Sequence, residues 1–291
     1  MPHPIDWIPD VQHCILPENF PWFTRLIRDH RFSAQLNRSR GHVVFSSQSA
    51  LSSAIGVYGA PRAATHILRF VTVPEDSWYG DPAPVMARHK IPPQFFIVCD
   101  QFWIHKDHAT AFRAVAKLAR EGRKIHLVCT GPVTDHHHPG YIARLKAEIR
   151  QLGVESRVQI LGTIPRADQM ALVRASQAVI QPSQFEGWSS IVEEAKAFGK
   201  AVILSDHPVH KEQVAANFFY FRSGDFEDCA RAITQFSQRQ TIEPFEPKSH
   251  DIRMADFART FMGIAHEAVS AGAGSIHREP SLDSHLGLRA G

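Results

Sequence analysis

Two glutamates near the start of an apolar segment are the side chains of this sequence best placed for chemistry. Glu186 lies in a loop, and Glu194, with seven residues between the two, falls in the first turns of a segment with helical spacing. A helix N-terminus presents free backbone N–H groups and the positive end of the helix dipole, which together attract phosphate. Carboxylates beside that phosphate can accept hydrogen bonds from sugar or ribose hydroxyls. The spacing therefore predicts a site for a phosphorylated, hydroxyl-rich ligand.

The start of this helix is expected to be built by a capping box. Ser190 and Glu193 have the S-x-x-E spacing, with Ser190 as the N-cap and Glu193 as the third helical residue. This role would leave Glu186 and Glu194 as the functional candidates. A second interpretation of Glu194 stays open, namely a solvated acid that only stabilises the helix dipole.

The elements that would position these residues alternate between strand-like and helix-like segments. The apolar runs of strand length are Phe95–Cys99, Ile125–Cys129, Val158–Leu161, Ala178–Ile180 and Ala201–Leu204. The segments with helical spacing are residues 109–119, Tyr141–Leu152, Asp168–Ala175 and Ile191–Phe198. This alternation predicts βαβ units, hence an α/β fold with a parallel sheet. Ligands in such folds bind at the carboxyl ends of the strands.

The first part of the chain has a different pattern. Its expected elements are a loop at Trp7–Asp10, a helix at Phe23–Ser39, a strand at Val43–Phe45, a helix at Ser47–Val57 and a strand at His66–Val71. These strands are too few for a complete doubly wound sheet. We therefore expect a partial N-terminal domain that packs on the second domain or lacks an upstream piece. The expected divisions are residues 1–83, residues 84–270 and a flexible tail at 271–291.

Composition excludes several classes of protein. The chain of 291 residues is 44% hydrophobic and 21% charged, as in globular proteins, and its net charge of +3 gives no footprint for nucleic acid. The four cysteines form no CxxC pair, which favours free thiols in a reducing compartment. No apolar run is long enough to span a membrane. The expectation is a cytoplasmic protein, with peripheral contact at the inner membrane left open.

The stretch from Glu186 to Glu194 resembles the E-x7-E motif of retaining nucleotide-sugar glycosyltransferases of group 1, family 4 in the sequence classification. Members of this family have the GT-B architecture of two Rossmann-like domains. The family commonly reads E-G-F-G-x-P-x-x-E, and this chain departs from it at Trp188, Ser189 and Ile191. The resemblance implies one complete C-terminal Rossmann-like domain and a partial N-terminal one that lacks most of the acceptor side.

Other loops match the family in the same order. Lys106 matches a lysine that neutralises the donor diphosphate, whereas Gln101 stands where the family has an arginine. Gly131 matches the glycine after the second strand, and Ile164 lies in the loop that usually flanks the nucleobase. His13 is similar to an acceptor-domain histidine that touches the donor sugar, and a plain loop histidine is the alternative. The similarity is continuous over residues 84–236 and weaker over residues 7–73.

The resemblance implies a hexosyl-type transferase that moves a sugar from a nucleotide-diphosphate donor to an unknown hydroxyl acceptor with retention. Glu194 would bind the ribose, Glu186 would hold the sugar, and Lys106 would stabilise the departing diphosphate. The other residues assigned to the donor site are Gly187, Trp188, Ser189 and Ser190. The backbone amides near Ser189 and Ser190, at the start of the helix, would also bind the diphosphate. The acceptor would be a saccharide or a lipid-linked molecule, and neither cofactor nor metal is expected.

Several alternatives remain at this stage. His136–His138 are three adjacent histidines, and tetrahedral metal sites use spaced ligands, so we expect a solvated loop there. Lys106 could also be an ordinary surface lysine. The chain itself could be a non-catalytic nucleotide-sugar-binding remnant, or a partner chain could supply the acceptor half.

Overall fold

The N-terminal unit is built on a small parallel sheet. The computed structural model describes residues 3–135, 137–214, 218–239 and 247–273. The sheet has the order β1 (Ile5–Trp7), β2 (His42–Phe45), β3 (Ala64–Ile67). The expected loop at Trp7 is wrong, because β1 pairs with β2 from Ile5 opposite His42 to Trp7 opposite Val44. A strand of three residues is too short to show a period, and only its pairing with β2 reveals it.

Helices cover one face of this small sheet. They are α1 (Gln12–Ile15), α2 (Trp22–Leu36) and α3 (Gln48–Tyr58), with the short 3-10 helix η1 (Pro17–Asn19) between the first two. Phe32 and Leu36 of α2 pack with Val43 and Phe45 of β2 in one apolar cluster. Ser47 caps α3, since its Oγ accepts a hydrogen bond of 2.9 Å from the N–H of Ala50. The expected helices and the strands at Val43–Phe45 and His66–Val71 are present with ends shifted by a few residues.

The second unit contains a six-stranded parallel sheet. Its spatial order is β6 (Val158–Gly162), β5 (Leu127–Thr130), β4 (Phe96–Cys99), β7 (Val179–Gln181), β8 (Val202–Ser205), β9 (Phe218–Phe221). The five expected strands are confirmed within two residues, and β9 was not predicted. Strands β4, β5 and β6 form one half of the sheet, and strands β7, β8 and β9 form the other half. The switch point thus lies between β4 and β7, where a ligand site is expected.

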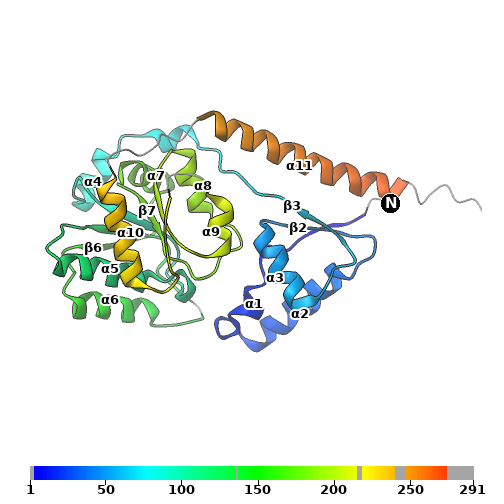
Figure 1. Cartoon of the computed structure of the whole chain (residues 1–291), viewed down its shortest axis with the longest axis horizontal. Coiled ribbons are helices and arrows are strands. Elements are labelled where there is room, and N and C mark those ends of the chain that lie inside the picture. The colour runs from blue at the N-terminus through cyan, green and yellow to red at the C-terminus, as the bar shows by residue number, and fades with distance from the viewer. Residues whose placement is uncertain (1–2, 136, 215–217, 240–246, 274–291) are drawn as a thin grey trace, which may run out of the picture.

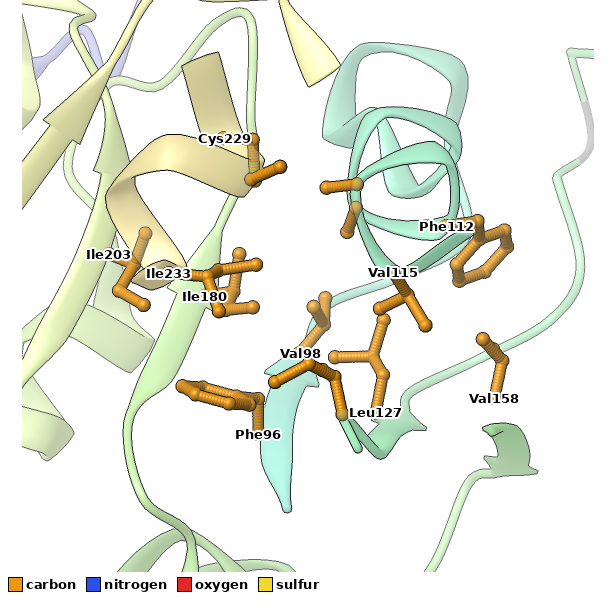
Figure 2. Close-up of a cluster of buried hydrophobic side chains, with 14 of the residues drawn as sticks. Phe96, Val98, Phe112, Val115, Leu127, Val158, Ile180, Ile203, Cys229 and Ile233 are labelled. Carbon is orange, nitrogen blue, oxygen red and sulfur yellow. The ribbon is translucent and has the colours of Figure 1, made fainter. Parts of the chain in front are cut away.

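Helices cover both faces of the large sheet. They are α4 (Ala83–His89), α5 (His108–Arg120), α6 (Tyr141–Leu152), α7 (Arg166–Ala175), α8 (Ser190–Ala197), α9 (Pro208–Gln213) and α10 (Phe226–Gln238), with 3-10 helices η2 (Asp76–Tyr79) and η3 (Ile104–Lys106). On one face, Val98 of β4 packs against α5 and α10 (Figure 2). On the other face, Ile97 lies in a cluster with residues of α7 and α8. Successive residues of β4 therefore serve opposite faces, as a sheet buried on both sides requires.

A long final helix returns to the N-terminal unit. Helix α11 (Pro247–Ala273) runs past β2 and β3 (Figure 1). Ile264 and Ala268 are buried there, and the carbonyl of Ala268 accepts a hydrogen bond of 3.0 Å from the N–H of His3. Beyond Ala273 the expected tail lies outside the described residues. No helix among the described residues is long and apolar enough to cross a membrane.

Side chains of the large unit hold the two units together. The carboxylate of Glu212, on α9, accepts hydrogen bonds from the backbone N–H groups of Gln48 (2.9 Å) and Ser49 (3.1 Å) at the start of α3. Its Oε1 also accepts a bond of 2.8 Å from Arg69 Nε. An acid from one unit thereby meets the positive end of a helix in the other.

Candidate functional site

The switch point of the large sheet carries a pocket of about 300 Å³. Loops after β4, β5, β6 and β7 contribute to it. Its lining residues are Cys99, Asp100, Gln101, Lys106, Gly131, Pro132, Arg166, Gln169, Glu186, Trp188, Ser189, Ser190 and Ile191. The structure thus brings seven of the residues singled out in the sequence to one place, which we call the switch-point pocket.

Lys106 lies at the centre of the charges in this pocket. Its Nζ is 2.9 Å from Asp100 Oδ1 and 2.7 Å from Glu186 Oε1, and its side chain is only 12% exposed. The alternative of an ordinary surface lysine is therefore wrong. Burial acts to lower the pKa of Lys106, but the carboxylates of Asp100 and Glu186 outweigh it and raise that pKa. The ammonium group consequently stays charged at every physiological pH.

Glu186 is held in place from two sides. Its Oε1 accepts hydrogen bonds from Lys106 Nζ and, at 2.9 Å, from Gln181 Nε2. Burial acts to raise the pKa of Glu186, but the positive charge of Lys106 outweighs it and lowers that pKa, so the carboxyl is ionised. The same Nε2 atom of Gln181 also donates to Ser189 Oγ at 3.1 Å. Gln181 was not singled out from the sequence, although a polar residue at the carboxyl end of a buried strand could have indicated it.

The capping box expected at the start of α8 is wrong. The helix begins at Ser190, its N-cap is Ser189, and no side chain caps it. Glu193 is buried and pairs with Lys196 Nζ at 2.7 Å, on its own helix, and with Arg253 Nη1 at 2.6 Å, on α11. Its carboxylate binds these cations instead of capping the helix.

Some backbone groups at the start of α8 already form hydrogen bonds within the chain. The N–H of Ser189 donates to Gln213 Oε1 at 3.1 Å, and the carbonyl of Ser189 accepts from Gln213 Nε2 at 2.9 Å. That amide is therefore not available to a phosphate. Ser190 itself is exposed and lines the pocket.

Glu194 is a buried partner of an arginine rather than a solvated acid. Its side chain forms an ion pair with Arg166, the first residue of α7. Burial raises the pKa of Glu194 to about 7, with Arg166 acting against that rise. The sequence analysis missed Arg166, which directly follows the loop containing Ile164. The guanidinium of Arg166 supplies the pocket with a positive charge, which the uncharged Gln101 does not.

Two glycines near the pocket are required by close packing. Gly131 has φ +138°, and a Cβ atom there would lie 2.0 Å from the carbonyl oxygen of Asp100. Gly187 faces the other unit, since a Cβ atom there would lie 2.4 Å from the carbonyl oxygen of Pro9. The neighbouring Trp188 donates from Nε1 to the carbonyl of Phe70 at 3.1 Å. The loop that carries Glu186 is thus also the contact between the units.

Four residues singled out in the sequence are not among those that line the pocket: Gly187, Glu194, His13 and Ile164. His13 is buried in the N-terminal unit, where its Nε2 lies 3.1 Å from both Asp29 Oδ1 and the Tyr58 hydroxyl. Burial lowers the pKa of His13. Ile164 packs beside the apolar cluster on the α7 face of the sheet.

His137 and His138 lie in a loop near the N-terminal unit. The backbone N–H groups of His137 and His138 donate to Asp135 Oδ1, and His138 Nε2 lies 3.1 Å from Asn19 Oδ1. His136 is outside the described residues. Within the described chain, the atoms clustered closely enough to hold a metal ion belong to two other groups, His13–Cys14–Asp29 and His42–His66–Glu267. Neither group lines the switch-point pocket.

A family model described as glycosyl transferases group 1 matches residues 86–254, which is more than half of the chain. The chain belongs to this family. No curated protein matches the sequence closely.

Several solved structures share its fold. HepE of Anabaena, in complex with UDP-glucose, is 18% identical with a TM-score of 0.72, and the match covers 93% of this chain and 72% of that one. Sucrose-phosphate synthase from Thermosynechococcus elongatus is 17% identical with a TM-score of 0.61, covering 88% of this chain and 61% of that one. A trehalose-phosphate synthase from Burkholderia vietnamiensis is 12% identical with a TM-score of 0.62, covering 82% and 62%. The GT-B-type α/β fold expected from the sequence is confirmed. The chain spans only about three fifths of the length of the two synthases.

Proposed function

We propose that the switch-point pocket binds a nucleotide-diphosphate sugar and that the chain serves transfer of its hexosyl group to a hydroxyl acceptor with retention. The observation that carries this proposal is the juxtaposition of two cation–carboxylate pairs. Lys106, Glu186 and Arg166 line the same pocket at the sheet's carboxyl edge, where Lys106 pairs with Glu186 and Arg166 pairs with Glu194. Cations of this kind suit a diphosphate, and carboxylates suit the hydroxyl groups on either side of it.

Each side chain has a proposed role. Lys106 and Arg166 neutralise the charge that grows on the diphosphate as the bond to the sugar breaks, which lowers the barrier more than it strengthens ground-state binding. Glu186, kept ionised by Lys106, accepts hydrogen bonds from the sugar hydroxyls. Glu194 accepts hydrogen bonds from the ribose. Gln101, Trp188 and Ser190 complete the lining, and no cofactor takes part in this scheme.

The proposal is most specific about the identity of the donor. HepE is described in complex with UDP and glucose, and with UDP-glucose. UDP-glucose is therefore the first donor to test on this chain. For the acceptor we propose a saccharide or a lipid-linked molecule, met at the cytoplasmic side of the inner membrane.

Titration calorimetry of the chain with UDP-glucose, UDP and uridine tests donor binding. We expect UDP to bind at least tenfold more tightly than uridine, since only the diphosphate meets Lys106 and Arg166. The Arg166→Gln variant should lose most of that preference, and the exposed Lys124→Gln variant should keep it. Equal affinity for UDP and uridine in the unchanged chain would contradict the proposal.

Turnover separates transfer from binding alone. Release of UDP from UDP-glucose in the presence of saccharide or lipid-linked acceptors supports transfer, and proton NMR of the product reports whether the anomeric configuration is retained. Binding without any release of UDP would favour the alternative of a donor-binding subunit that needs a partner.

A further inference from the structure

Two histidines meet on the face of the small sheet that α11 covers. His42 is the first residue of β2, and His66 lies on β3 opposite Val44. Side chains alternate along a strand, so His42, Val44 and His66 share one side of the sheet. Val44 lines the apolar cavity under α11, which identifies that side. The Nδ1 atom of the buried His42 lies 2.9 Å from Nε2 of His66.

This contact brings two imidazole nitrogens together, and each nitrogen can offer a lone pair. A single proton between them gives one N–H···N hydrogen bond, and a metal ion is the other cation that such a pair can share. Zinc binds imidazole nitrogen at about 2.0–2.1 Å, so two nitrogens of a tetrahedral site lie about 3.3 Å apart. The pair of His42 and His66 needs to open by only about 0.4 Å to reach that spacing.

A carboxylate of α11 provides a third ligand atom. Oε2 of Glu267 lies 4.0 Å from Nε2 of His66, and the ligand atoms of the three residues all lie within 4.8 Å of one another. The Glu267 side chain is 62% exposed, so it is free to rotate and close the remaining distance. Burial lowers the pKa of His66, which keeps its ring in the neutral form that binds metals. Two imidazoles and one carboxylate, with water in the fourth position, form a known type of zinc site.

The other group of potential ligands in the described chain is a hydrogen-bonded network. Oδ1 of Asp29 accepts a bond of 2.8 Å from the Tyr58 hydroxyl and one of 3.2 Å from the Cys14 thiol. The same oxygen lies 3.1 Å from Nε2 of His13. A metal ion there would have to displace these bonds, and burial also raises the pKa of the Cys14 thiol. The group on the small sheet is therefore the better metal site.

We infer that His42, His66 and Glu267 bind a zinc ion that fastens α11 to the small sheet. The ion joins two neighbouring strands to a helix some 200 positions further along the chain. The other end of α11 is held by the large unit, where Arg253 Nη1 lies 2.6 Å from Glu193 Oε2. Zinc thereby stabilises the docked position of a helix that contacts both units. The site is separate from the switch-point pocket, and the inference does not rest on the proposed transferase activity.

Equilibrium dialysis of the full chain, without a histidine tag, against buffered Zn²⁺ tests this inference. The variants His42→Ala and Glu267→Gln should each weaken the binding of one zinc ion at least tenfold, because even loss of a residue that supports a ligand costs about 10–100-fold. Mg²⁺ should not compete, since it prefers oxygen ligands. The exposed His30→Ala change on α2 is the matched control and should bind zinc as the unchanged chain does.

A second measurement follows the docked helix itself. Zinc should raise the midpoint of thermal unfolding and slow amide hydrogen exchange in α11 around Glu267, and Glu267→Gln should remove both effects. Thermal unfolding of metal-free Glu267→Gln like that of the unchanged chain would show that the variant folds and that its lost zinc binding reports a lost ligand. Equal zinc affinity in the unchanged chain, His42→Ala and Glu267→Gln would overturn the inference and place the ion elsewhere. A chain that binds no zinc would also overturn it and leave the two histidines joined by a hydrogen bond.

Discussion

The Nζ atom of Lys106 lies 2.7 Å from Glu186 Oε1, although the two residues are 80 positions apart in the sequence. The adjacency of β4 and β7 creates this contact, because the loops after these strands leave the sheet side by side. Asp100 Oδ1 approaches the same ammonium group at 2.9 Å. Two carboxylates thus share one buried cation.

Replacing Lys106 by methionine should destabilise the fold strongly. The change would leave two carboxylates close together in a buried place with no cation between them. Breaking a buried ion pair in this way costs about 3–5 kcal/mol in the free energy of unfolding. Urea unfolding of Lys106→Met, compared with the exposed Lys124→Met, measures the loss. Adding Glu186→Gln to Lys106→Met should restore part of the stability, and a single variant as stable as its control would refute the importance of the contact.

Nucleotide-sugar affinity should fall as the pH drops below about 7. Burial raises the pKa of Glu194 to about 7, so its carboxyl takes up a proton in that range and loses an acceptor for ribose hydroxyls. We expect the affinity to decrease by up to about tenfold for each pH unit below this pKa. Calorimetry with UDP-glucose is suitable because its diphosphate has no group that titrates near neutrality. The Glu194→Gln variant should bind more weakly at pH 8 and show no such dependence. A flat profile in the unchanged chain would exclude the role proposed for Glu194.

Much of the fold could be predicted because the central strands of a parallel sheet are continuous apolar runs. Strands β4, β5, β7 and β8 are buried runs of this kind, and the partly buried edge strand β6 was predicted as well. Strand β1 has only three residues, and the missed edge strand β9 is partly buried as β6 is. The site was harder to predict in detail. Glu193 seemed a capping residue from local spacing, but its partner Arg253 lies 60 positions away on α11. Arg166 and Gln181 were missed for the same reason, since only the packing of neighbouring loops shows that they meet Glu194 and Glu186.

Replacing Gly187 by alanine should weaken the contact between the two units. The added Cβ atom would lie 2.4 Å from the carbonyl oxygen of Pro9, and a backbone atom cannot move aside easily. We expect a loss of about 1–3 kcal/mol in the free energy of unfolding. Gly56→Ala in α3 is the control, because nothing lies within 4 Å of its added Cβ and it should stabilise the chain by about 0.5–1 kcal/mol. Equal behaviour of the two variants would show that the approach to Pro9 has no energetic effect.

The Glu212→Gln variant should loosen the same junction by removing a charge. Glu212 accepts hydrogen bonds at the start of α3 and from Arg69, and a carboxylate is favoured there by the helix dipole. The contact is partly open to water, so we expect a loss of about 1 kcal/mol that shrinks as salt is added. Thermal unfolding at low and high salt, with the exposed Glu155→Gln as control, provides the measurement. A difference between the two variants that does not depend on salt would argue against an electrostatic origin.

Helix α11 packs on the small sheet but is synthesised last, and this order affects the folding of the nascent chain. The apolar face lined by Trp7 and Phe70 is complete once Phe70 has been added to the chain, but the helix that packs on it starts only at Pro247. At about 5–20 residues per second, a ribosome needs roughly 10–40 s to deliver that helix. During this interval the nascent chain carries an uncovered hydrophobic surface. A chaperone that binds nascent chains would therefore find its target in the earliest part of this protein and lose it when the last helix docks.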